Sequence, residues 1–196
     1  LILYILALKL GLIKGDLEKT KLDEKLKDLK ELPKLIEQTL LTDNKVQNIS
    51  NTFNEAKGSM FLGRGFSYPI ALEGALKLKE LSYVHAEGYP AGEMKHGPLA
   101  LIEEGMPVVV LAPRDNHYKK TISNMQEVIA RGAKVLLVTN KSKDEIHSEN
   151  IWETIEVENL TEDLLPFLTT IPLQKLAYYS ALQKGYDIDK PRNLAK

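Results

Sequence analysis

The 196-residue sequence contains no cysteine. This absence excludes disulfide bonds, thiolate metal sites and a cysteine nucleophile within the chain, and it fits a cytoplasmic protein. The histidines do not suggest zinc either, because His85 and His96 lack zinc-ligand spacing and a cluster of partner ligands. Any nucleophile in this chain must therefore be another kind of group.

The chain also has no excess of one charge and no apolar run long enough to cross a bilayer. Its formal net charge is −1, so nothing electrostatic points to nucleic acid or a membrane as a partner. The N-terminal "LILYILALKLGLI" covers thirteen residues and is broken by Lys9 and Gly11. It lacks the basic region and cleavage site of a signal peptide. We predict a core helix of a chain whose beginning is missing.

What the chain does contain is a helical first part. Residues 16–41 carry apolar residues at steps of three and four, which predicts one amphipathic helix that Pro33 should kink or divide. A short helix is expected near 43–56. The alternating lysines and acids on the first of these helices indicate a solvated face, and we assign them no chemistry.

After residue 58 the sequence pattern changes and predicts strands that alternate with helices. Most of the strands are apolar on both faces, which predicts a parallel sheet covered on both sides, the doubly wound α/β class. Helices are expected over 68–84, 116–131 and 169–185. The strand candidates are "SMFLGRG" from 59, "PVVVLAP" from 107, "KVLLVTN" from 134, "IWETIEV" from 151 and, more weakly, "HAEGY" from 85.

Ligands of such folds gather at the carboxyl ends of the strands, which points to the loops after Leu62, Tyr89 and Leu111. The "GRG" at 63–65 could cradle a phosphate between backbone N–H groups and the following helix. It matches neither the Walker pattern nor the dinucleotide pattern. A tight strand-to-helix turn explains the same glycines equally well.

Three charged residues form a polar stripe on the helix that follows the first strand. Glu73, Lys77 and Glu80 are spaced by four and three residues, so they share one helical face. A solvated ladder of salt bridges would produce the same spacing. A carboxylate held beside an ammonium group at the end of this helix could also serve as a general base.

The histidines and the last lysine have different expected roles. His85 is expected to be structural, and His117 and His147 to be exposed on the surface. His96 lies in the "MKHGP" loop, where an imidazole suits proton transfer near neutral pH. Lys196 is either a solvated chain end or, if folded into a shielded site, a Schiff-base lysine.

Three long stretches together resemble the C-terminal part of the glutamine–fructose-6-phosphate aminotransferase (isomerising) family, the glucosamine-6-phosphate synthases. They are "FLGRGFSYPIALEGALKLKELSY", "HAEGYPAGEMKHGPLALI" and "DIDKPRNLAK". The resemblance extends over almost the whole chain and is weakest in 16–58 and 140–165. It implies a sugar isomerase (SIS) domain with a flavodoxin-like, doubly wound, five-stranded parallel sheet, preceded by a helical connector.

The resemblance also implies roles for five residues. Lys196 would form an imine with C2 of open-chain fructose 6-phosphate, and Ala195 would contact the substrate. Glu80 would move a proton between C1 and C2, assisted by Lys77. His96 would open the sugar ring and would reach the site from the neighbouring subunit of a homodimer.

By the same resemblance, residues 1–49 form a helical segment from the end of a first SIS domain and a connector. Residues 50–191 form the second SIS domain, and 192–196 a catalytic tail. The N-terminal glutaminase and most of the first SIS domain would be partners supplied by the same enzyme. No cofactor is needed, since imine formation already acidifies the C1 proton.

The expected activity is therefore the isomerase part of glucosamine 6-phosphate synthesis, with the fragment alone inactive. Two alternatives remain, a non-catalytic module that binds sugar phosphates and a purely structural dimerisation half. Neither alternative gives a reason for Lys77, Glu80, His96 and Lys196 to occur together.

Overall fold

The computed structural model describes residues 1–140 and 150–193. Its helices and strands follow in the order α1 (Ile2–Lys14), α2 (Lys19–Leu40), α3 (Asp43–Glu55), β1 (Ser59–Gly63), α4 (Ser67–Ser82), β2 (Ala86–Pro90), the 3₁₀ helices η1 (Ala91–His96) and η2 (Pro98–Leu101), β3 (Pro107–Leu111), α5 (Tyr118–Ile129), β4 (Lys134–Asn140), β5 (Glu153–Val157) and α6 (Leu165–Gln183).

The strands form one five-stranded parallel sheet in the order β2-β1-β3-β4-β5. This is the flavodoxin-like doubly wound order, in which the direction of winding reverses between β1 and β3. The predicted fold class is confirmed, including the weaker candidate strand that became β2. The predicted final helix begins earlier than residue 169, because Pro166 suits the first turn of α6.

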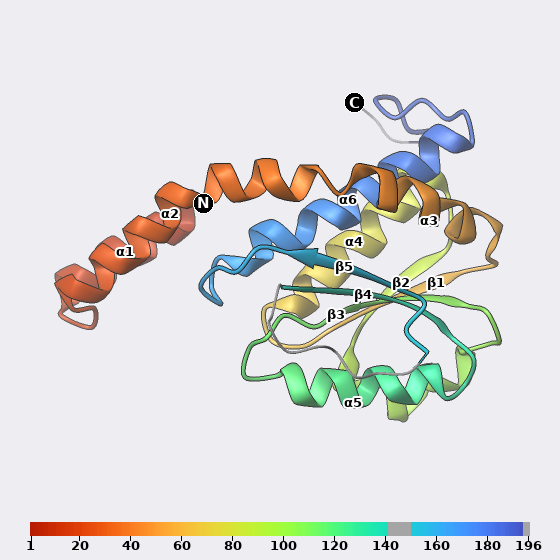
Figure 1. The fold of residues 1–196 in the computed structure, drawn as a ribbon, viewed down its shortest axis with the longest axis horizontal. Helices are drawn as coiled ribbons and strands as arrows, with labels where there is room; N and C mark the ends of the chain where they lie inside the picture. The colour runs from red at the N-terminus through yellow and green to blue at the C-terminus, as the bar shows by residue number, and fades with distance from the viewer. Residues whose placement is uncertain (141–149, 194–196) are drawn as a thin grey trace.

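The two faces of the sheet are covered by different helices (Figure 1). Helices α3, α4 and α6 lie on one face, while α5 and η1 lie on the other. Successive residues of β3 alternate between the two layers: Val109 packs with the first group, and Val108 and Val110 pack with the second. Both faces of β1 and β3 are therefore buried, which accounts for their continuous apolar runs.

The helices α1 and α2 form an N-terminal arm, most of which extends away from the sheet (Figure 1). Helix α2 is continuous through Pro33, so the chain is not divided there. Leu32 of α2 packs against Val157 and Leu168, which attaches the second half of α2 to the domain.

A partly buried carboxylate, that of Asp163, makes a second attachment of the N-terminal arm. Tyr4 Oη donates a hydrogen bond of 2.8 Å to Asp163 Oδ2, and Lys25 forms an ion pair with the same oxygen. Burial alone would raise the pKa of Asp163, but the hydrogen bonds from Lys25 and Tyr4 hold it below its ordinary value.

The prediction of a core helix at the N-terminus is half right. Residues 2–14 are helical, but Leu8 is the one buried residue of α1, and Ile2 and Leu3 are 81% and 79% exposed. A helix that is apolar all round needs neighbours on every side, and here α1 packs chiefly along α2. Among the described residues, no helix combines the length and apolarity that crossing a bilayer would need.

Candidate active site

The polar stripe of α4 lies on the outer face of that helix. Ala71, Ala75 and Leu78 fill the inner face and pack against the sheet, which turns Lys77 and Glu80 outward. Pro69 lies in the first turn, where its missing N–H has no helical partner to lose. The helix therefore holds the stripe on a rigid element rather than on a loop.

Lys77 and Glu80 form a direct pair. The distance from Lys77 Nζ is 2.7 Å to Glu80 Oε2 and 3.9 Å to Glu73 Oε1. The hydrogen bond to Glu80 outweighs the effect of desolvation and raises the pKa of Lys77 above its ordinary value. The lysine is therefore a fixed positive charge at neutral pH, and the Glu80 side chain, 23% exposed, lies directly beside it.

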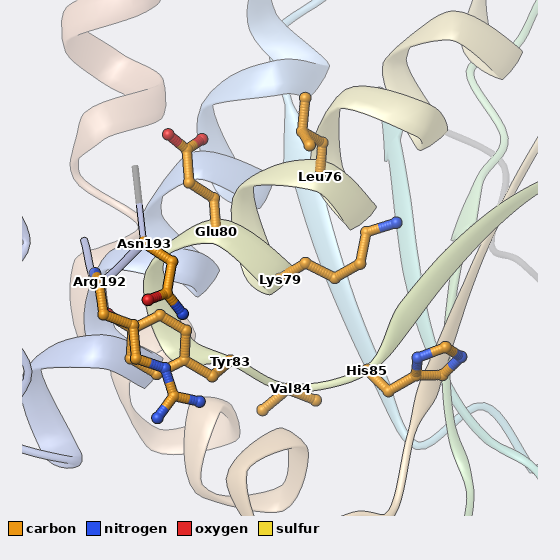
Figure 2. Close-up of a pocket in the computed structure, with 8 residues that line it drawn as sticks. All are labelled: Leu76, Lys79, Glu80, Tyr83, Val84, His85, Arg192 and Asn193. Carbon is orange, nitrogen blue, oxygen red and sulfur yellow. The ribbon is translucent and has the colours of Figure 1, made fainter. Parts of the chain in front are cut away.

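Glu80 also lines a pocket of about 730 Å³ where α4 ends and the chain turns toward the edge strand β2. Figure 2 shows its lining: Leu76, Lys79, Glu80, Tyr83, Val84, His85, Arg192 and Asn193. Lys77 does not line this pocket and instead borders a second one of about 510 Å³, together with Lys175 and Tyr179. The pair thus lies between two pockets on the outer surface of α4, the second of which is also lined by α6.

The C-terminal segment returns to this pocket and is held there by Tyr83. The backbone N–H of Arg192 donates a hydrogen bond of 2.8 Å to Tyr83 Oη, and the Arg192 guanidinium lies 4.0 Å from the centre of the Tyr83 ring. Asn193 continues the wall of the pocket beside this ring (Figure 2). Ala195 and Lys196 lie outside the described residues. Sequence analysis missed Tyr83 and Arg192 because they are far apart in the chain and belong to no pattern of spacing.

His96 lies on the other side of the sheet from Glu80. Its helix η1 is anchored by Met94, which packs with Met125 of α5, whereas Leu78 of α4 belongs to the opposite layer. The His96 side chain is 75% exposed, and its Nε2 is 3.9 Å from Glu93 Oε2. Within one chain, therefore, the structure brings Lys77 and Glu80 together but not His96.

The glycine-rich turn at the carboxyl end of β1 is occupied by side chains of the protein itself. Gly65 has a φ of +52°, and a Cβ built on it would be 2.7 Å from Cδ2 of His117. Arg64 donates from Nε and Nη2 to the Oδ1 of buried Asn124, at 3.1 and 3.0 Å. A Cβ on Gly92 would be 2.6 Å from Arg64 Nη2. The turn is thus packed against η1 and α5, as the alternative of a tight structural turn requires.

Two other histidines differ from their predictions. His117 is half-buried against Gly65 rather than fully exposed. His85 precedes β2, its side chain is 68% exposed, and it lines the Glu80 pocket 3.3 Å from Glu87 Oε1, so it is not a packed structural residue. His147 lies outside the described residues. Within residues 1–140 and 150–193, no group of three or more histidine, aspartate or glutamate side chains could hold a metal ion.

The model of the SIS domain family matches residues 52–184, so this chain belongs to the SIS domain family. The matched region begins near the end of α3 and ends just after α6, and it includes the whole sheet, the Lys77–Glu80 pair and His96.

The more particular similarity is to glutamine–fructose-6-phosphate aminotransferases (isomerising). The chain is 51% identical over 168 residues to that of Bartonella henselae, covering 86% of this chain and 28% of the relative. It is 48% identical over 195 residues to that of Bacteroides thetaiotaomicron, covering 100% of this chain and 32% of the relative. The chain therefore spans about a third of the length of these relatives.

A solved structure shows the same similarity in three dimensions. The C-terminal domain of glucosamine-fructose-6-phosphate aminotransferase from Francisella tularensis superposes with a TM-score of 0.92 at 42% identity. The match covers 96% of this chain and 53% of that one. The resemblance noted in the sequence is confirmed, and the chain corresponds to the C-terminal part of this kind of enzyme.

Proposed function

We propose that this chain is the isomerase part of a glutamine–fructose-6-phosphate aminotransferase, which converts fructose 6-phosphate and glutamine-derived ammonia to glucosamine 6-phosphate. One observation carries the proposal: Glu80, paired with Lys77, lines the same pocket as Arg192 and Asn193, the residues that lead to the C-terminal lysine. A base on a helix and a lysine on a tail can meet there although they are far apart in the sequence.

The proposed chemistry uses the lysine as a nucleophile and the carboxylate as a base. The Lys196 amine adds to the C2 carbonyl of the open-chain sugar and water leaves, forming an imine that makes the C1 proton more acidic. Glutamine-derived ammonia then adds to C2 and displaces the Lys196 amine, so that the ammonia nitrogen is held at C2 as an imine. Glu80 takes the acidic proton from C1 and returns it to C2, which leaves an aldehyde at C1 and an amino group at C2. Lys77, paired with Glu80 at 2.7 Å, keeps the Glu80 carboxyl group oriented for both transfers, and Ala195 contacts the substrate.

The position of the tail supports the role of Lys196. Consecutive Cα atoms are 3.8 Å apart, so three residues span at most about 11 Å. Asn193 lines the pocket beside Glu80. The length of the chain therefore allows a lysine three positions later to reach the proposed base while Arg192 stays on Tyr83.

His96 is proposed to open the sugar ring of a neighbouring subunit in a homodimer. The exposure of its side chain and its location on the layer opposite α4 favour a role outside its own chain. An imidazole that changes charge near neutral pH suits the proton transfers of ring opening. The sugar phosphates are the proposed ligands, and neither a cofactor, a nucleic acid nor a membrane has a part in this reaction.

We also propose the division of the chain that the resemblance implies. Residues 1–49 are the end of a first SIS domain and a connector, 50–191 the second SIS domain and 192–196 the catalytic tail. The glutaminase and the remainder of the first SIS domain supply ammonia and most of the phosphate contacts. The cytoplasm, where sugar phosphates are made, is the proposed location.

The direct test is to trap the imine in a complete enzyme. In the Bacteroides thetaiotaomicron relative, this chain would replace the segment with which it aligns over 195 residues. Fructose 6-phosphate is added to the chimera, borohydride reduces any imine to a stable amine, and peptide mass spectrometry locates the adduct. We expect an adduct on Lys196 that is lost in Lys196→Arg and retained in the matched control Lys190→Arg.

Two results would contradict this proposed function. A chimera that binds fructose 6-phosphate by calorimetry but gives no adduct would make this chain a binding or assembly module. The isolated chain should form no glucosamine 6-phosphate from glutamine and fructose 6-phosphate, and formation of product by it would contradict its assignment as a part of the enzyme.

A further inference from the structure

The last turn of α4 ends at a residue whose backbone is unusual for its type. Tyr83 follows the helix with a φ of 57° and a ψ of 21°, in the left-handed region. Glycine is common at this position because a side chain there costs roughly 1 kcal/mol. A bulky residue that is kept in a strained conformation suggests that its side chain has a use.

The Tyr83 ring is the centre of a small cluster made by segments from three parts of the chain. Tyr186, just after α6, packs at 4.8 Å between ring centres, and the Arg192 guanidinium lies 4.0 Å from the ring centre on the tail. The hydroxyl oxygen accepts the Arg192 N–H at 2.8 Å. The ring and the hydroxyl thus hold the same tail residue by two different interactions.

A second contact ties the end of α6 to the same turn. Lys184 Nζ donates a hydrogen bond of 3.2 Å to the carbonyl oxygen of Ser82, the residue before Tyr83. The segment that leads to the tail therefore begins at a fixed position, the end of α6 at Lys184. Pro191 is buried and restricts the backbone immediately before Arg192. Between Tyr186 and Arg192, the path of the chain is set at both ends by Tyr83.

We propose that Tyr83 is a positioning residue that anchors the C-terminal tail to the last turn of α4, and so sets the distance between the tail and Glu80. Tyr83 and Glu80 lie three residues apart on one element and line one pocket (Figure 2). A tail held by Tyr83 is thereby aligned with the proposed base. The catalytic half of this inference rests on the proposed function, whereas the anchoring half does not.

Anchoring can be measured on this chain without any substrate. Trypsin can cut after Arg192 only when the guanidinium leaves the Tyr83 ring, and the cut removes the last four residues, which intact mass detects. We expect Tyr83→Ala to accelerate this cut about tenfold and Tyr83→Phe about threefold, since the first removes both interactions and the second only the hydroxyl acceptor. Amide exchange of Arg192, followed by NMR, should accelerate in the same order.

Two controls separate anchoring from general unfolding. Tyr118 of α5 also lies under an arginine, with Arg114 at 4.9 Å from its ring centre, but on the opposite layer. Tyr118→Phe should leave the Arg192 cut unchanged. The cut after Lys14, at the end of α1, should keep its rate in every variant. If Tyr83→Ala accelerates the cuts after Arg192 and Lys14 equally, that variant is unfolding as a whole. The rate of the Arg192 cut in Tyr83→Phe would then decide whether Tyr83 anchors the tail. An unchanged rate at Arg192 in Tyr83→Phe and Tyr83→Ala would overturn the proposal.

The catalytic consequence is tested in the chimera. Tyr83→Phe should slow the trapping of the borohydride adduct about threefold and leave the dissociation constant for fructose 6-phosphate unchanged, because only the approach of the tail is impaired. A change in sugar binding with an unchanged trapping rate would refute positioning. If the unmodified chimera binds the sugar and gives no adduct, the proposed function fails, and the trypsin result still decides the anchor.

Discussion

The two ends of α4 are opposites. At its beginning, the turn 63–65 is rich in glycine, carries a cation and follows a buried strand, yet His117 and Asn124 occupy the space around it. At its end, Tyr83 replaces the usual glycine, and a pocket with charged walls opens beside Glu80. The end whose glycines suggest a ligand site in the sequence is filled by the protein's own side chains, and the pocket opens at the other end.

At the beginning of α4, close packing of the backbone explains a glycine without any ligand. A Cβ on Gly63 would be 2.3 Å from the carbonyl oxygen of Ser67, so this glycine is required by backbone approach alone. Arg64 then joins the turn to α5 and contacts Gly92 of η1, the helix that carries His96. The closed end of α4 therefore supports His96, and the open end holds Glu80 and the tail.

The largest expected effect is at the open end. Glu80→Gln in the chimera keeps the size of the side chain but removes the base, so turnover should fall about 10³-fold while the borohydride adduct on Lys196 still forms. The matched control is Glu153→Gln on β5, which breaks a comparable lysine pair, with Lys45 at 2.9 Å, and neither residue lines the two pockets beside Glu80 and Lys77. Loss of turnover in the control alone, or full turnover in Glu80→Gln, would remove Glu80 from the mechanism.

The next largest effect concerns Glu80 and His96, which we propose to act together across the subunit interface of a homodimer. Chimeras carrying Glu80→Gln or His96→Ala should each be nearly inactive. After mixing and re-association, random pairing makes half of the dimers mixed, each with one intact site, so about a quarter of the activity should return. Turnover measured before and after mixing checks this. No recovery, in a mixture shown by mass spectrometry to contain mixed dimers, would mean that His96 acts within its own chain.

Most of the fold was predictable from the sequence, and half of the site was. Strands such as 107–111 are apolar on both faces, and only a parallel sheet covered on both sides accommodates them. Helical spacing also predicted that Lys77 and Glu80 share one face of α4. The contact of Tyr83 with Arg192 could not be predicted, because it joins residues 109 positions apart that follow no common period.

The exposed α1 was unpredictable for a related reason. Its apolar residues indicate burial, but composition does not say which surface buries them. The separation of His96 from Glu80 depends on which face of the sheet each helix covers, and that follows from the order of the strands rather than from local sequence.

The smallest effect concerns the closed end, where stability rather than catalysis should change. Gly63→Ala forces a methyl group against the Ser67 carbonyl, which is backbone and cannot turn aside, so the free energy of unfolding should fall by about 3 kcal/mol. Gly185→Ala is the control, since its φ is +68° with open space around it and the cost should be roughly 1 kcal/mol from conformation alone.

Urea unfolding of the isolated chain measures both variants. If the turn instead binds phosphate, inorganic phosphate in 10-fold excess should raise the urea midpoint of unfolding of the native chain but not that of Gly63→Ala. We expect no such difference, because the protein's own side chains already fill the turn. A phosphate-dependent shift would reopen the closed end as a ligand site and weaken the contrast between the two ends of α4. A loss in Gly63→Ala no larger than that in Gly185→Ala would contradict a requirement for glycine at 63 by the close approach of Ser67.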